Sequence, residues 1–195
     1  MSDLIDELVG IRPGSALDAL RANRPVARSD AQATYDGLIT APADLERASA
    51  TERAAIGYWV AALSRAESLT AHYRGLLVDL DPAVLAAIDV ALPAATTTGP
   101  YGAYPAGPLS VEDEEGLVWA ASAELRDAVG DRLAAALAHA HLLTFRPRDS
   151  SPDALQALLD TGWSTDGVVT VSQLIAFTHF QLRVVAGLSV LKETI

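Results

Sequence analysis

Residues 49–78 read SATERAAIGYWVAALSRAESLTAHYRGLLV, and this stretch contains no proline. Its apolar residues recur at helical spacing and form one stripe, while charged residues such as Arg53 and Arg74 fall mostly on the other side. Ser49 followed three residues later by Glu52 is the pattern of a capping box, which marks where a helix begins. The stretch therefore predicts one long helix that packs at the centre of the fold.

The rest of the chain also reads as helices, because no segment alternates cleanly between apolar and polar residues with the period of a strand. Caps, Gly and Pro set the expected ends of these helices. The expected helices cover residues 3–9, 15–23, 30–39, 43–48, 81–92, 118–144 with a break near Gly130, 152–162 and 165–191. We therefore expect an all-α protein with an N-terminal helical extension, residues 1–48, and a main domain, residues 49–195.

One segment cannot form a regular element. Residues 93–110 read PAATTTGPYGAYPAGPLS, and the repeated Pro and Gly interrupt any helix or strand. A loop of this length inside a compact domain is either functional or disordered. Tyr101 and Tyr104 favour a docked lid or interface loop over a floppy linker, and both are candidate ligand-binding residues.

Composition excludes several classes of function. The formal net charge of the 195 residues is −11, and no cluster of Lys and Arg offers a face for nucleic acid. The absence of cysteine excludes disulfides, thiolate metal sites and thiol redox chemistry by this chain alone. The N-terminus is acidic and we expect no apolar run of membrane-spanning length, so we expect a cytoplasmic protein without a membrane partner.

Two stretches resemble a known superfamily. Residues 142–191 contain a short helix ending at Gly162, a Ser-capped start and the pattern IAFTHFQLRVVAGL at residues 175–188; residues 52–68 contain the tripeptide SRA. Together these features resemble the carboxymuconolactone decarboxylase and alkylhydroperoxidase D-like superfamily, in its Cys-less decarboxylase-domain subgroup. The resemblance covers roughly half of the chain. It implies an alkylhydroperoxidase D-like helical bundle, a homo-oligomer and a Cys-containing, peroxidase-like partner protein.

The residues of the thiol peroxidase site are not kept. In peroxidase members of the superfamily, SRA leads into Cys-x-x-Cys with a following His and an upstream Glu. Aligning SRA places Leu69 and His72 at the two Cys positions, Leu76 at the His position and Gly57 near the Glu position. We therefore expect no thiol peroxidase activity from this chain.

The histidines supply the remaining candidates for chemistry. His72 is either a general acid or base working with Glu67, or a histidine hydrogen-bonded at a helix–helix seam. His179 lies in an apolar run and is either a core histidine or a ligand-binding residue. His139 and His141 are two residues apart, which is not the spacing of a zinc site on a helix. Neither a metal site nor a cofactor is expected.

Two functions remain open. The first is an alkylhydroperoxidase D-like protein without the redox Cys pair, acting as an accessory or binding subunit of a peroxidase-like system. The second is a decarboxylase- or isomerase-type enzyme acting on a small organic acid or lactone. In that case His72 and Glu67 are the acid and base, and the loop of residues 93–110 closes the pocket.

Overall fold

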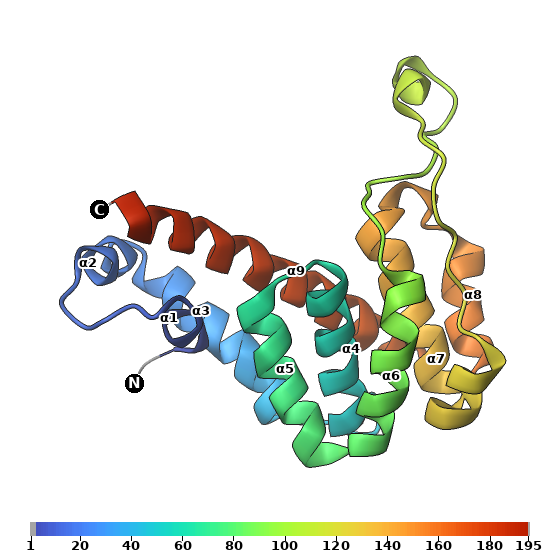
Figure 1. The fold of residues 1–195 in the computed structure, drawn as a ribbon, viewed down its shortest axis with the longest axis horizontal. Helices are drawn as coiled ribbons and strands as arrows, with labels where there is room; N and C mark the ends of the chain where they lie inside the picture. The colour runs from blue at the N-terminus through green and yellow to red at the C-terminus, as the bar shows by residue number, and fades with distance from the viewer. Residues whose placement is uncertain (1–2, 195) are drawn as a thin grey trace.

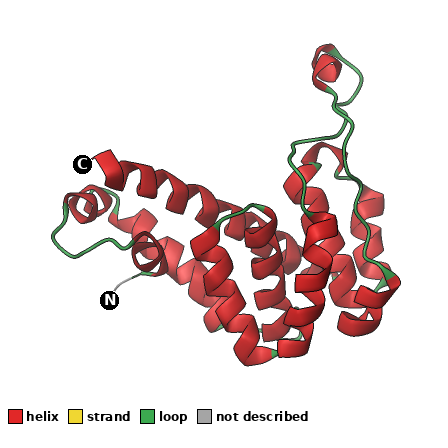
Figure 2. Ribbon diagram, in the orientation of Figure 1, coloured by secondary structure: helices red, strands yellow, loops and turns green. Residues whose placement is uncertain are grey.

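The computed structural model describes residues 3–194, and within that range the fold is all-α, as predicted (Figure 2). There are nine α-helices, one π-helical turn and two 3₁₀ turns, and no β-strand is present among these residues. The helices are α1 (Leu4–Val9), α2 (Ala16–Ala22), α3 (Pro25–Tyr35), α4 (Ala50–Leu63), α5 (Glu67–Leu80), α6 (Pro82–Ala95), α7 (Ala123–Phe145), α8 (Pro152–Asp160) and α9 (Thr165–Thr194).

The prediction of one long helix over residues 49–78 was wrong, because the chain folds back after Leu63 and forms α4 and α5. Arg65 adopts a φ of +56°, and the backbone N–H of Ala66 donates to the carbonyl of Ala61 over 3.1 Å. The turn is so short that the apolar spacing continues across it, which is why periodicity does not reveal it. The capping box of Ser49 and Glu52 is present as predicted.

The close approach of α4 and α5 depends on Gly57. A Cβ atom at this position would lie 2.5 Å from Cε1 of Tyr73, so only glycine leaves room for the ring. The Tyr73 hydroxyl in turn donates to Oε1 of Gln181 on α9 over 2.6 Å. These contacts join three helices.

Helix α4 is the centre of the packing, as predicted. It contacts α5, α6, α7 and α9, and ten of its residues are buried. Trp59 is fully buried, and its Nε1–H donates to the carbonyl of Leu137 on α7 over 2.9 Å. A helix buried on all sides needs apolar residues all round, and α4 has them.

The N-terminal helices α1 and α2 pack against the C-terminal end of α9 (Figure 1). An ion-pair cluster joins α1, α2 and α3: Asp6 is bound by both Arg21 and Arg28, and Arg21 also pairs with Asp3 over 2.8 Å. Arg28 reaches Asp18 over 2.8 Å as well. Side chains that are far apart in the sequence are thus tied together beside the end of α9.

Two N-terminal expectations need correction. Helix α3 begins at Pro25 rather than at residue 30, because proline suits the first position of a helix. Residues 43–48 form turns, not a helix. The Asp44 side chain accepts the backbone N–H of Glu46 over 2.9 Å, and Arg53 donates to the carbonyl of Asp44, also over 2.9 Å. Local side-chain bonding of this kind competes with helix formation.

Helix α9 corrects another expectation. It is long and apolar enough to cross a membrane by length and composition, with a mean hydropathy of 1.6 over its most apolar window of 18 residues. A third of that window is buried inside this fold. The first half of α9 carries buried residues such as Val171 and Leu174. The core helix of a soluble protein can have the same length and hydropathy as a membrane-spanning helix.

The expected loop is longer than predicted and projects from the bundle (Figure 1). We call residues 96–122 the arm. Helix α6 runs past Pro93 to Ala95, because a proline in the last turn leaves most of the helical hydrogen bonds in place, and α7 starts only at Ala123. Gly102 and Glu114 exchange two backbone hydrogen bonds across the arm, of 2.8 and 3.2 Å. The 3₁₀ turn Pro108–Glu112 forms its tip.

The arm is anchored to the short segment that follows α7. The Ala103 N–H donates to the Asp149 carboxylate over 3.0 Å, and the Arg148 guanidinium covers the Tyr104 ring at 4.2 Å. Arg148 also donates to the Glu112 carbonyl over 2.8 Å. These contacts favour the docked loop over the floppy linker.

Candidate functional site

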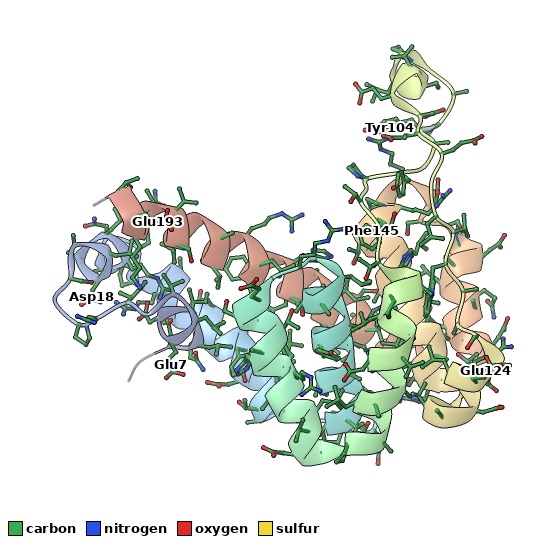
Figure 3. The ribbon with its side chains drawn as sticks, viewed as in Figure 1. Glu7, Asp18, Tyr104, Glu124, Phe145 and Glu193 are labelled. Carbon is green, nitrogen blue, oxygen red and sulfur yellow. The ribbon has the colours of Figure 1, made fainter. Side chains whose placement is uncertain are left out.

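A pocket of about 950 Å³ opens where four parts of the chain meet. These are the turn between α4 and α5, the base of the arm, the end of α7 and the middle of α9. Figure 3 marks this region by Phe145, at the base of the arm. The lining of the pocket includes Leu63, Arg65, Thr97, Leu143, Thr144, Phe145, His179, Leu182, Arg183 and Ala186.

The charge of this pocket is opposite to that of the protein. Arg65 and Arg183 line it, and none of the lining residues is an Asp or Glu, although the chain as a whole has a formal charge of −11. Among residues 3–194 neither arginine pairs with a carboxylate. Within this described range, Arg183 donates to the carbonyl of His179, one turn back on its own helix, over 2.9 Å. Two exposed guanidinium groups therefore remain available to an anion.

The backbone holds Arg65 in an unusual conformation. Its φ of +56° is in the left-handed region, and it is the one non-glycine residue with positive φ in the part of the chain that the structure describes. Such a residue costs on the order of 1 kcal/mol and is found disproportionately at functional sites. The tight turn places Arg65 in the lining of the pocket.

His179 and Thr144 are polar residues of the pocket lining that contact each other. The Thr144 hydroxyl donates to the carbonyl of Ala140 over 2.7 Å, so it can only accept from Nε2 of His179, which lies 3.1 Å away. His179 is thereby assigned as the Nε2–H tautomer, with a lone pair left on Nδ1. Burial, followed by the charge of Arg183, lowers the pKa of His179, so the ring is neutral at pH 7.

The structure does not bring Glu67 and His72 together. They are five residues apart on α5, so they point in directions about 140° apart, and neither lines the pocket. His72 lies at the seam of α3 and α5, where its Nε2 is 2.8 Å from the hydroxyl of Tyr35. Burial lowers the pKa of His72 and raises that of Tyr35 to about 12. This geometry favours the hydrogen-bonded seam over the acid–base role.

The two loop tyrosines have different surroundings. The Tyr101 hydroxyl is 3.0 Å from Oγ1 of Thr97, which lines the pocket, and the Tyr101 N–H donates to the carbonyl of Phe145 over 2.6 Å. Tyr101 thus holds the base of the arm beside the pocket. Tyr104 lies further along the arm, away from the helices (Figure 3). Of the three candidate ligand-binding residues, only His179 lines the pocket itself.

Sequence reasoning missed two of the pocket residues and left two roles open for a third. Arg183 stands in the last apolar run, where an arginine either pairs with a buried carboxylate or reaches an oligomer interface. It is exposed and has no carboxylate partner among residues 3–194, so the first role is wrong and the second stays a prediction. Arg65 gave a signal only through the SRA tripeptide. Thr144 gave none, because a threonine at the end of an apolar helix is common and carries no pattern.

The other two histidines do not form a metal site. His141 is buried, and its Nε2–H donates to the carbonyl of Ala95 at the end of α6 over 3.0 Å. His139 is also buried, and neither of its ring nitrogens has a hydrogen-bond partner in the described chain. Residues 3–194 contain no group of three or more His, Asp or Glu side chains placed to hold a metal ion.

Comparison of the chain with models of protein families, with curated proteins and with solved structures gave no match. Two of the four positions that the resemblance aligns with the peroxidase site are closed by packing. Leu69 is fully buried in the core, and the ring of Tyr73 leaves no room for a side chain at Gly57. Geometry and charge at the pocket are therefore the basis for a functional proposal.

Proposed function

We propose that this protein binds a small organic acid in the pocket lined by Arg65, His179 and Arg183. The observation that carries the proposal is the pair of arginines without carboxylate partners in a pocket free of acidic residues. Guanidinium groups bind carboxylates through two parallel hydrogen bonds, and such charge-assisted bonds are stronger than neutral ones. The ligand supplies the negative charge that the protein does not.

The walls of the pocket suit the carbon skeleton of such an acid. Leu63, Leu143, Phe145 and Leu182 supply apolar surface next to the cationic groups. Ligand pockets usually combine apolar walls with a few polar groups that orient the ligand. A carboxylate held by arginine, with its hydrocarbon part against these side chains, satisfies both requirements.

This proposal agrees with the first function suggested by the superfamily resemblance, a binding subunit without thiol chemistry. No cysteine is present, and the aligned positions Leu69 and Gly57 are occupied by core packing. An acid-binding subunit of a peroxidase-like system, working beside a Cys-containing partner, is the form of the function that we propose.

A specific observation supports the enzyme as a second candidate, with a different base. His179 is neutral and keeps a lone pair on Nδ1, and it lines the same pocket as the two arginines. A neutral imidazole near a bound carboxylate is suited to proton transfer. In a decarboxylase or isomerase of this kind, His179 takes the part first assigned to His72 and Glu67.

Calorimetric titration tests the binding proposal. Succinate and benzoate are expected to bind, whereas succinamide and benzamide, which match them in shape but lack the charge, are not. Arg183→Gln should weaken binding about tenfold or more, because a hydrogen bond to a charged group contributes roughly 1.5–3 kcal/mol. Arg65→Asn should weaken binding to a similar extent. Asparagine is chosen here because it tolerates the left-handed backbone conformation at this position.

Arg126→Gln is the matched control, because Arg126 is exposed on α7 and does not line the pocket. It removes the same charge and should leave the affinity unchanged. If all three variants lose affinity equally, the net charge of the protein explains the loss and the two pocket arginines do not. Binding of the amides would refute the role of charge.

For the second candidate, His179→Gln should abolish the conversion of a bound acid, as followed by NMR. It should change the affinity for that acid less than Arg183→Gln does.

A further inference from the structure

The outer face of α9 is an apolar stripe that no part of residues 3–194 covers. Its exposed apolar side chains are Val169, Phe180, Val190 and Leu191, with exposed fractions between 40% and 64%. The exposed small residues Ala176 and Gly187 continue the same stripe at spacings of three and four residues. Arg183 is the one charged residue between positions 167 and 191.

The tip of the arm has the complementary character. Leu109 and Val111 are 52% and 89% exposed. Residues 112–115 are Glu, Asp, Glu and Glu, and the arm contains no Lys or Arg. The arm projects from the bundle (Figure 1), and its tip carries these exposed apolar residues next to the acidic run. Such a segment has the features of an interaction element.

The arm does not cover α9 of its own chain. The bonds from Asp149 to Ala103 and from Arg148 to Glu112 hold it to the segment after α7. The ring of Tyr101 packs so closely on Gly116 that a Cβ there would lie 2.2 Å from the ring. These contacts fix the direction of the arm, so that its apolar tip is left for another molecule.

We propose that the arm of a second copy of this chain docks on the outer face of α9. Leu109 and Val111 then pack on the apolar stripe, and the acidic run 112–115 lies near Arg183, the only charge on that stripe. Exchange of arms between two copies makes the interface symmetric and closed, as in most homo-oligomers. Charge complementarity between the four acidic residues of the arm and Arg183, the one charged residue on this face, selects this occupant.

The docked arm also borders the pocket. Arg183 and Ala186 are exposed on α9 and line the pocket as well, so an arm on this face covers part of the opening. The inference itself stands on the apolar stripe and the arm, and does not depend on the ligand proposed above.

Sedimentation equilibrium of the full chain tests the proposal. The wild-type protein is expected to be a dimer at micromolar concentration. Phe180→Glu, and separately the double change Leu109→Ser with Val111→Ser, should each raise the dimer dissociation constant at least tenfold. Val26→Glu is the control, because Val26 is 67% exposed on α3 and outside both surfaces. Circular dichroism should show the same helix content in all variants.

Charge reversal identifies the contact. Arg183→Glu alone should weaken the dimer, and so should an arm in which Glu112, Glu114 and Glu115 are all changed to Lys. Combining the two sets should restore association, because each copy then carries the reversed charges on both surfaces. A monomeric wild-type chain at 100 µM, or a dimer that the arm variants leave intact, would overturn the proposal. The proposal would also be overturned if wild-type protein sediments with phosphatidylcholine vesicles and Phe180→Glu does not, since a membrane would then cover this face.

Discussion

Replacing Asp6 with alanine is expected to lower the free energy of unfolding by about 3–5 kcal/mol, the usual cost of removing one partner from a buried ion pair. The Asp6 side chain is 4% exposed and is bound by both Arg21 and Arg28. The Arg21 side chain is 9% exposed, so the change leaves this largely buried guanidinium with Asp3 in place of two carboxylate partners. This decrease in the free energy of unfolding is larger than the contribution that an exposed ion pair makes, which is about 0–1 kcal/mol.

Chemical denaturation followed by two probes measures this effect. The three tryptophans, Trp59, Trp119 and Trp163, lie outside α1–α3, so their fluorescence reports on the bundle, whereas circular dichroism reports on every helix. The control is Asp30→Ala, an exposed carboxylate on α3, which should change stability by less than about 0.5 kcal/mol. If Asp6→Ala is no more harmful than this control, the cluster does not stabilise the N-terminal helices.

Replacing His139 with leucine should raise stability by about 1–3 kcal/mol at neutral pH, because it removes a buried polar ring whose nitrogens are unsatisfied. His139 is 5% exposed, and neither nitrogen has a partner in the described chain. Leucine has a similar volume and fits an apolar interior without a hydrogen bond. His141→Leu is the matched comparison; it should destabilise, since it removes the bond to the carbonyl of Ala95.

His139→Leu should also make the free energy of unfolding depend less on pH. Burial lowers the pKa of His139 below its ordinary value of 6.5, so between these two pKa values the unfolded chain binds more protons than the folded one. Stability is therefore fully present above pH 6.5 and is lost as the pH falls through the folded pKa. Burial lowers the pKa of His72, His141 and His179 too, so part of the loss should persist. Wild-type and His139→Leu curves that run parallel between pH 7 and pH 4.5 would contradict the assignment.

Helix ends set by local chemistry were predictable from the sequence. Gly10 and Gly162 end their helices with positive φ, Ser15 and Asp81 cap theirs, and Gly130 marks the break in α7. Each of these signals depends on one residue and its immediate neighbours. The turn at Arg65 was not predictable, because a non-glycine residue in this conformation is held there by the packing of α4 on α5.

The candidate site was only partly predictable for the same reason. His179 was named as a ligand-binding candidate, and it lines the pocket. The two arginines come from positions 65 and 183, and only the tertiary fold brings them to one pocket. His72 had a more suggestive position in the sequence, because the alignment of SRA places it at a Cys position, but its Nε2 is hydrogen-bonded to the hydroxyl of Tyr35 on α3. A hydrogen bond between residues 37 positions apart leaves no local pattern.

The Tyr73 ring over Gly57 has a consequence for how this sequence can change. The two positions share one space, so a residue larger than glycine at 57 fits only if the residue at 73 becomes smaller. Loss of the Tyr73 hydroxyl would in turn leave Gln181 without its 2.6 Å hydrogen bond inside the core. In chains that keep this fold, positions 57, 73 and 181 should therefore vary as a set.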